Sequence, residues 1–197
     1  MPSIFRATKN VIDHPLFNFN DRNLLKSLKP YDPQAALTRY KGGGYLSVNA
    51  ALREENPVTE DMARLINGID EGLRQLPAYH GDTYRTVAFH DKTAFDAFTN
   101  EWKQGKIVHA TAYTSSSKGE LYNNLLANPD VKYGAIMKLH SRTGRNMDAA
   151  DFNNGKEDEE SEILFPRNTL FHVSQAAVSS PSPNKSILFL AAEEVQP

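Results

Sequence analysis

The spacing of the apolar residues changes near Pro77, and this change constrains the fold more than any other feature of the sequence. Before Pro77, apolar residues from Met62 to Leu76 recur every three or four positions, which predicts an amphipathic helix beginning at Thr59 with its stripe in the core. From residue 83 onward, β-rich runs alternate with polar turns and short helical segments. Helices that come first and strands that follow predict an α+β fold and argue against a repeated βαβ unit.

Two further helices are expected before Thr59. Asp32 and Pro33 suit an N-cap and a first helical position, and the run Gly42–Gly44 predicts a hinge between this helix and a second one over 45–55. The polar stretch 140–159 is long for a connection, and such loops are often functional. Helices are also expected over 92–102 and 119–127, and strands over 83–89, 106–114, 131–139, 161–165, 170–178 and 186–192.

The length of 197 residues predicts one domain, since a domain has roughly 100–200 residues. We assign that domain to residues 33–197. Residues 1–32 carry several prolines and turn-forming residues, and we interpret them as a lead segment with a delivery or docking role. This amino terminus has no apolar stretch of the kind that a classical signal peptide requires.

Composition and missing motifs exclude several classes of protein. The chain has no cysteine, which excludes disulfides, thiolate metal sites and a cysteine nucleophile. The net charge of −2 argues against a nucleic-acid binder, and no apolar run reaches the length of a membrane helix. The six histidines are scattered, so we expect no metal site. There is no phosphate-binding glycine loop and no G-x-S-x-G nucleophile motif.

Three short segments carry residues suited to chemistry. Arg85 lies in the middle of a β-rich run, Ser115–Ser117 follow an apolar strand, and Glu160 and Glu162 lead into Ile163. Each has an ordinary explanation by itself: a solvent-facing arginine, a serine turn, and a solvated acidic loop or a calcium site. The two-residue period of a strand would place Ser115 with Ser117, and Glu160 with Glu162, on common faces. Two carboxylates held close together favour a site that uses a cation.

Taken together, the three segments predict a pocket for an anionic ligand that contains a sugar. An arginine binds phosphate through its forked donors, and a serine hydroxyl holds neighbouring groups in place. A carboxylate can bind a ribose hydroxyl and stabilise positive charge that develops at the anomeric carbon.

The same order of motifs resembles the arginine–serine–glutamate class of mono-ADP-ribosyltransferase toxins. Arg85 in TYRTV matches the first-strand arginine, YTSSS at 113–117 matches the serine–threonine–serine motif, and Glu160-Ser161-Glu162 before ILFPRNT matches the Glu-x-Glu motif. The helical lead-in resembles that family as well, at Tyr40, Gly44-Tyr45, Asn49 and Leu52-Arg53. Thr86 stands where the family usually has glycine, and Ser116 stands where it has threonine.

The resemblance implies an ADP-ribosyltransferase-like fold, with a helical N-terminal part packed on a β-sandwich core of two sheets, and NAD as the substrate. Arg85 would contact the NAD phosphates, Ser115 would hold Glu162 in place with Ser117 beside it in the NAD site, and Glu162 would stabilise the oxocarbenium-like state. Glu160 would orient an acceptor arginine and accept its proton. The loop before Glu160 would be the substrate-facing turn, with Phe152 touching the target protein.

The function expected from this resemblance is transfer of ADP-ribose from NAD to an arginine of a target protein, with release of nicotinamide. A NAD glycohydrolase and a non-catalytic binding module are the alternatives. The target could be a cytoskeletal polymer or a GTPase, and an immunity protein is left open as a second partner. We expect a bacterial toxin or effector, secreted by injection and acting in the cytosol of the target cell.

Overall fold

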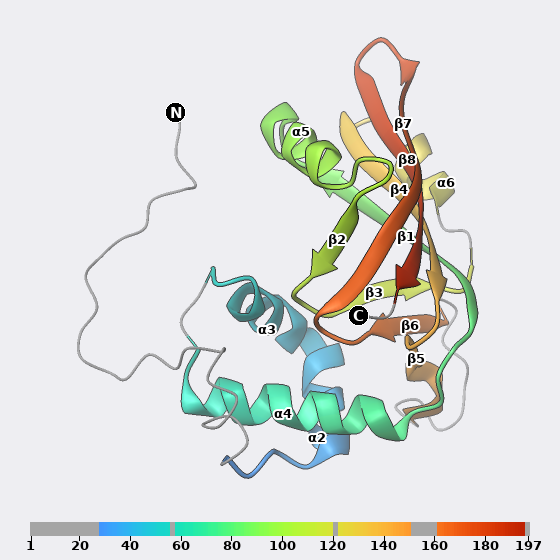
Figure 1. Cartoon of the computed structure of the whole chain (residues 1–197). Helices are drawn as coiled ribbons and strands as arrows, with labels where there is room; N and C mark the ends of the chain where they lie inside the picture. The colour runs from blue at the N-terminus through green and yellow to red at the C-terminus, as the bar shows by residue number, and fades with distance from the viewer. Residues whose placement is uncertain (1–27, 56–57, 120–121, 151–160, 196–197) are drawn as a thin grey trace, which may run out of the picture.

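The computed structural model describes residues 28–55, 58–119, 122–150 and 161–195, and its helices come before most of its strands. Figure 1 shows a helical layer packed against a strongly curved sheet, with α5 and α6 on the sheet. The expected α+β architecture is confirmed. The helical layer consists of α2 (Pro33–Arg39), the π-helical turn η1 (Tyr40–Gly44), α3 (Tyr45–Leu52) and α4 (Glu60–Gln75).

The starts of α2 and α4 follow the expected capping pattern. The Asp32 side chain accepts a hydrogen bond from Ala35 N at 2.9 Å, and the Thr59 hydroxyl accepts one from Met62 N at 3.2 Å. The predicted apolar stripe of α4 lies in the core of the helical layer. The glycine run produces the expected break, because the backbone leaves helical geometry at Gly42 and Gly43, and Gly43 has a φ of 112°.

In the described part of the chain, eight strands form one continuous sheet in the order β2-β7-β8-β4-β1-β3-β6-β5. All neighbouring strands are antiparallel except β4 and β8, which run parallel. The strands are β1 (Gly81–Phe89), β2 (Ile107–Ala110), β3 (Thr114–Ser117), β4 (Tyr133–Ser141), β5 (Arg145–Asn146), β6 (Glu162–Phe165), β7 (Thr169–Ser182) and β8 (Lys185–Val195). Short α- and 3₁₀-helices interrupt them: α5 (Lys92–Glu101), α6 (Tyr122–Ala127) and η2 (Met147–Ala150).

The two sheets of the expected sandwich are two parts of this one sheet. Among the described residues, β1 and β3 face each other through a single pair, Tyr84 and Ser117. The sheet is held by the fewest pairs at this point, so it can bend sharply there. Beyond the bend, β3 and β6 cross the direction of the longer strands (Figure 1). Phe165 of β6 packs into the same core as Phe171 and Leu188 of the longer strands, so the two parts cover each other.

The expected single strand over 106–114 is wrong, because the chain breaks between β2 and β3. Val108 packs in the core of the long strands, whereas Ala112 and Tyr113 are buried in the core of the helical layer. An apolar run looks continuous in the sequence even when its two halves enter different cores. The bend between the halves brings β3 to the edge of the helical layer, next to β1 and β6.

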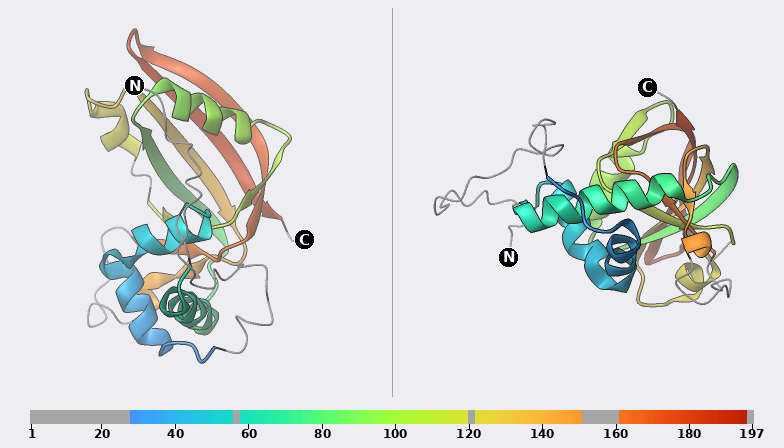
Figure 2. Two further views of the ribbon diagram at one scale, coloured as in Figure 1. Left: turned by 90° about the vertical axis from the view of Figure 1, so that its left-hand side faces the viewer. Right: turned by 90° about the horizontal axis from the view of Figure 1, so that it is seen from below.

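Helices cover both faces of the long strands. Phe95 of α5 packs with Met137 of β4 on one face, and Leu125 of α6 packs with Ile136 on the other, as the alternation of a strand requires. Figure 2 shows α5 lying across the long strands, including the hairpin of β7 and β8.

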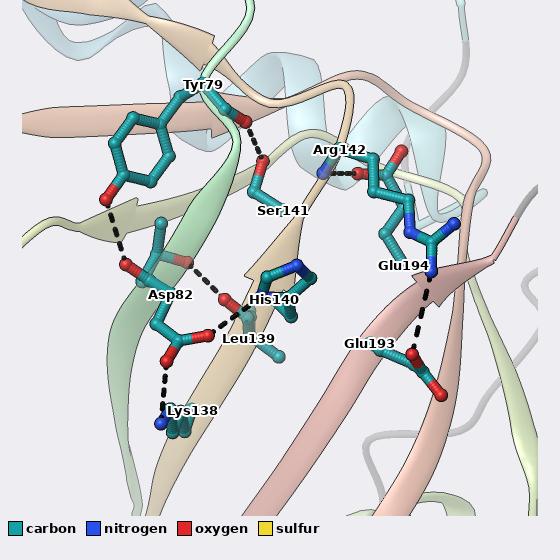
Figure 3. A network of polar contacts seen from close by, with 10 residues as sticks. Tyr79, Asp82, Lys138, Leu139, His140, Ser141, Arg142, Glu193 and Glu194 are labelled. Carbon is teal, nitrogen blue, oxygen red and sulfur yellow. Dashed lines mark hydrogen bonds and ion pairs between the residues drawn. The ribbon is translucent and has the colours of Figure 1, made fainter.

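A polar network joins β1, β4 and β8 near the helical layer (Figure 3). Asp82 accepts hydrogen bonds from Lys138 Nζ at 2.7 Å and from His140 Nδ1 at 2.8 Å. The buried Glu194 carboxylate accepts from the backbone N–H groups of Arg142 at 2.7 Å and Thr143 at 2.8 Å. These contacts fix the turn that follows β4 and the end of β8.

Candidate active site

A cavity of about 560 Å³ lies where α3 faces the bend of the sheet. Its walls come from the helical layer on one side and from β1, β2, β3 and β6 on the other. It combines cationic, acidic and aromatic side chains. The lining residues are Tyr40, Lys41, Tyr45, Asn49, Arg53, Arg85, Glu101, His109, Ala110, Thr111, Ala112, Tyr113, Thr114, Ser115 and Glu162.

Arg85 projects from the centre of β1 into this cavity. Its Nη1 donates a hydrogen bond to the carbonyl oxygen of Ser115 at 2.5 Å, and its side chain is half-buried. Burial lowers the pKa of Arg85 from its ordinary value, while the nearby Glu162 carboxylate acts in the opposite direction. An arginine stays protonated in proteins, so the cavity holds a cation with donors to offer an anion.

Ser115 and Glu162 are joined directly. The Ser115 hydroxyl donates a hydrogen bond to Glu162 Oε1 at 2.6 Å, a length typical of a bond to a charged acceptor. The antiparallel pairing of β3 and β6 places Ser117 opposite Glu162 and Ser115 opposite Leu164, so this bond runs diagonally across the ladder. The sheet therefore fixes the position of one carboxylate oxygen.

The helical layer supplies an aromatic and polar wall opposite Glu162. Asn49 Nδ2 donates to the Tyr40 hydroxyl at 3.2 Å, and Tyr40 is 4% exposed. Burial raises the pKa of Tyr40 to about 12, the Asn49 bond and the Arg85 charge oppose this, and the Glu162 charge adds to it. Asn49 Oδ1 is buried and has no hydrogen-bond partner among the described residues, so this acceptor can serve a bound molecule.

Three of the predicted site residues, Arg85, Ser115 and Glu162, meet in this cavity. Ser117 is not part of the described lining; it is buried, and its hydroxyl accepts a hydrogen bond from Gly119 N at 3.1 Å. Glu160 and Phe152 lie outside the described residues.

We expected the two-residue period of a strand to run from Glu160 to Glu162, but Glu160 lies outside the described residues. Strand β6 begins at Glu162, and Ser161 has a positive φ of 44°, outside strand geometry. The described strand therefore places Glu162 and gives no position for Glu160. The spacing of the two glutamates in the sequence therefore does not give their separation in space.

Sequence reasoning missed several residues of the cavity. Glu101 at the end of α5 and His109 of β2 belong to no motif, and only the turn between the two elements brings them to the cavity wall. His109 Nε2 also lies 3.1 Å from Asn168 Oδ1, across the β2–β7 pairing. Tyr40, Asn49 and Arg53 were noted in the resemblance but not assigned to the site.

The described residues hold neither a cluster of metal ligands nor a helix that could span a membrane. They contain no group of three or more histidine, cysteine, aspartate or glutamate side chains that could hold a metal ion. None of the helices in the described part of the chain is long and apolar enough to span a membrane.

Comparison with solved structures agrees with this fold. The type III effector XopAI from Xanthomonas axonopodis pv. citri superposes with a TM-score of 0.63 at 17% identity, over 83% of this chain and 63% of that one. Exoenzyme S from Pseudomonas aeruginosa, solved in complex with human 14-3-3 protein beta and Carba-NAD, superposes with a TM-score of 0.62 at 18% identity, over 86% of this chain and 76% of that one. At such identities the likeness concerns the fold alone.

Sequence comparison adds the family. The NAD(+)–protein-arginine ADP-ribosyltransferase Tre1 of Serratia proteamaculans is 30% identical over 131 residues, which are 66% of this chain and 25% of that protein. The present chain thus matches about a quarter of this relative's length. The profile of the ADP-ribosyltransferase exoenzymes matches residues 20–196. Since this match covers most of the sequence, the chain belongs to the ADP-ribosyltransferase exoenzyme family.

Proposed function

We propose that this protein transfers ADP-ribose from NAD to an arginine of a target protein and releases nicotinamide. The observation that carries the proposal is the 2.6 Å bond from Ser115 to Glu162 in a cavity that also holds Arg85. Family membership and the arginine-directed activity in the name of the Serratia relative support the same reaction.

The bond broken in this reaction joins the nicotinamide nitrogen to the anomeric carbon of the ribose. The bonding pair leaves with the nicotinamide, which becomes neutral, and positive charge develops on the ribose. Glu162, held by Ser115, is the group we assign to bind the ribose and stabilise that charge, an electrostatic effect of the kind that supplies much of enzymatic rate enhancement. Arg85 is assigned to the pyrophosphate, because its guanidinium is the cationic donor at the centre of β1.

The acceptor nitrogen of an arginine then forms a new bond to the anomeric carbon and must lose a proton. A protonated guanidinium is a poor nucleophile, so a carboxylate that binds it and takes this proton accelerates the step by about 10²–10⁴-fold. We assign this role to Glu160 and contact with the target protein to Phe152. Ser117, which faces Glu162 across the ladder, remains our proposal for a second serine at the NAD site.

We also propose that the chain acts as a bacterial toxin or effector, delivered by injection and acting in the target-cell cytosol. The description of the Xanthomonas protein as a type III effector supports this. The partner is a protein that bears the acceptor arginine, with a cytoskeletal polymer or a GTPase as candidates and an immunity protein as a second one. Residues 1–32 are proposed as the delivery or docking segment and 33–197 as the catalytic domain.

The test is to incubate the purified protein with NAD labelled in its ADP-ribose part, with and without a cell lysate. Label on a lysate protein that is released by arginine-directed cleavage, and absent with Glu162→Ala, supports the transferase. Nicotinamide release in every lysate without label on protein supports a glycohydrolase, and no turnover in any lysate supports a binding module. Glu160→Ala should abolish protein labelling while sparing much of the NAD hydrolysis; an equal loss of both would remove the role assigned to Glu160.

A further inference from the structure

Asp70 on α4 lies at the centre of a polar cluster behind the cavity wall. The Tyr113 hydroxyl donates to Asp70 Oδ1 at 2.6 Å, and Arg167 Nε and Nη2 each lie 2.9 Å from Asp70 Oδ2. The three side chains come from different segments: a helix, the linker between β2 and β3, and the turn between β6 and β7. The cluster therefore ties the helical layer to both strands of the site.

The cluster is buried and matched in charge. Tyr113 is 3% exposed, and about a fifth of each of the Asp70 and Arg167 side chains reaches solvent. The Tyr113 hydroxyl also lies 3.2 Å from the carbonyl oxygen of Ile66, one helical turn before Asp70. Burial raises the pKa of Tyr113 well above its ordinary value, and the Asp70 charge adds to this, so the hydroxyl keeps its proton and donates.

The cluster holds the end of the ladder that carries the catalytic pair. Thr114 and Phe165 are the last facing pair of β3 and β6, and Tyr113 and Arg167 lie just beyond it in the chain. Tyr113 precedes Ser115 by two residues, and Arg167 follows Glu162 by five. Fixing both ends to one carboxylate sets how β3 and β6 lie against each other, and with them the Ser115–Glu162 bond.

The cluster also reaches the opposite wall of the cavity. The Tyr113 ring packs edge-on against Tyr40, with 5.4 Å between ring centroids, and Tyr40 accepts the hydrogen bond from Asn49. Tyr40, Asn49 and Tyr113 all line the cavity. One chain of contacts thus runs from Arg167 through Asp70 and Tyr113 to the helical wall.

We infer that Asp70 is a positioning residue: through Tyr113 and Arg167 it holds the Ser115 hydroxyl at bonding distance from the Glu162 carboxylate. Asp70 is outside the described cavity lining, so its effect on the reaction passes through other side chains. This inference rests on the proposed function for its kinetic consequence, but its structural consequence can be measured without any turnover.

The test uses Asp70→Asn and Tyr113→Phe in the full chain, with Glu71→Gln as the matched control. Glu71 is the next residue on α4, is exposed and pairs with Arg74, so its loss leaves the cluster intact. For folded Tyr113→Phe protein we expect nicotinamide release to fall about tenfold in kcat, as expected when a charge-assisted contact at the site is loosened, with KM for NAD within about twofold. Asp70→Asn keeps an acceptor for the Tyr113 hydroxyl but loses the negative charge that pairs with Arg167, so its kcat should fall as well.

The second measurement is a crystal structure of each variant. A Ser115 Oγ to Glu162 Oε1 distance beyond 3.5 Å in the variants, with an unchanged distance in Glu71→Gln, supports the inference. An unchanged distance in Asp70→Asn and Tyr113→Phe overturns it, as does a kcat equal to that of the control. If wild-type protein releases no nicotinamide from NAD, the proposed function fails, and the distances alone decide whether Asp70 positions the pair.

Discussion

At the scale of single residues, the site depends on two side chains that are 47 positions apart in sequence. Ser115 and Glu162 each lie in a four-residue strand, and the pairing of β3 with β6 brings them together. The neighbouring Ser116 points elsewhere, because its hydroxyl donates to the carbonyl oxygen of Ile163 at 3.1 Å. Ser115 therefore positions the Glu162 carboxylate, whereas Ser116 supports the pairing of β3 with β6.

Ser115→Ala removes the bond to Glu162, and Ser116→Ala is its control. A hydrogen bond to a charged group contributes about 1.5–3 kcal/mol, so we expect nicotinamide release from NAD to fall about 10- to 100-fold in Ser115→Ala. Ser116→Ala should keep its kcat and lose about 1 kcal/mol of unfolding free energy, measured in urea. Equal activity of the two variants would contradict the role given to the Ser115 hydroxyl.

The sequence motifs predicted the three residues that meet in the cavity but not the cluster behind its wall. Arg85, Ser115 and Glu162 were found because each sits in a short motif whose chemistry is visible in the sequence. Asp70 and Arg167 lie 97 positions apart and belong to no motif, so only the packing of α4 on the β6–β7 turn shows that they meet. Glu160 lies outside the described residues, so its place beside Glu162 stays a prediction.

At the scale of elements, the break between α2 and α3 directs one wall of the cavity. Tyr45, Asn49 and Arg53 all follow this break and line the cavity. Gly43 adopts a φ of 112°, which side chains with a Cβ rarely adopt, whereas Gly42 has a φ of −74° and open space around it. The direction of α3 thus depends on Gly43 for its backbone angle and on Gly44, where a Cβ would lie 2.6 Å from the carbonyl oxygen of Arg39.

Gly43→Ala tests this dependence, with Gly42→Ala as the matched change. Strain of this kind costs about 1–3 kcal/mol, so Gly43→Ala should lower the unfolding free energy by that amount and raise KM for NAD. Gly42→Ala should change neither the unfolding free energy nor KM for NAD by more than the error of the measurement. A Gly43→Ala protein as stable and as active as Gly42→Ala would show that the break does not need its glycine.

The elements themselves were largely predictable, because caps and periodicity act locally. Thr59 and the apolar stripe that follows it correctly gave α4, and Asp32 with Pro33 gave the start of α2. The exception is the segment 106–114. Val108 and Tyr113 belong to one apolar run in the sequence, but Val108 packs in the core of the long strands and Tyr113 in the core of the helical layer. A local pattern cannot tell which of two cores a residue enters.

At the scale of the whole molecule, the boundary of the proposed catalytic domain can be tested by truncation. Tyr31 N donates to Arg64 O at 3.2 Å, Arg64 Nε donates to Lys29 O at 3.0 Å, and the Arg64 guanidinium lies 5.0 Å from the centre of the Tyr31 ring. Residues 28–32 therefore pack on α4, although they lie within our proposed lead segment.

Removal of residues 1–27 should leave the thermal midpoint unchanged if they form a separate delivery or docking segment. Removal of residues 1–32 also deletes the Asp32 cap and the Tyr31 contacts, and should cost about 2 kcal/mol of unfolding free energy. Thermal and urea unfolding of the two truncated proteins measures this difference. Equal stability of both would show that residues 28–32 do not contribute to the domain.

The network of Figure 3 gives the molecule a small dependence of stability on acid pH. The hydrogen bond from Lys138, and then that from His140, lowers the pKa of Asp82 from its ordinary value of 3.8. A carboxyl whose pKa is lower in the folded than in the unfolded state stabilises the fold above its ordinary pKa, and this contribution is lost as the pH falls through the folded pKa.

Wild type should therefore exceed Asp82→Asn in unfolding free energy at pH 7, and the difference should shrink as the pH falls below the ordinary pKa of an aspartate and through the lower folded-state pKa of Asp82. Because the Asp82 side chain is 41% exposed, we expect the difference to stay below about 1 kcal/mol. Urea unfolding of both proteins over this pH range measures it. A difference in unfolding free energy that grows as the pH falls would contradict a stabilising role for the Asp82 charge.

NAD cleavage in this cavity is tested most directly by the rate of nicotinamide release from NAD by wild type and by Glu162→Ala, compared at equal folded fraction. Loss of a group that stabilises developing charge costs about 10²–10³ in rate, so we predict a fall of that size or larger in Glu162→Ala with an unchanged thermal midpoint. Release of nicotinamide by Glu162→Ala at the wild-type rate would contradict the assignment of this cavity as the site of NAD cleavage.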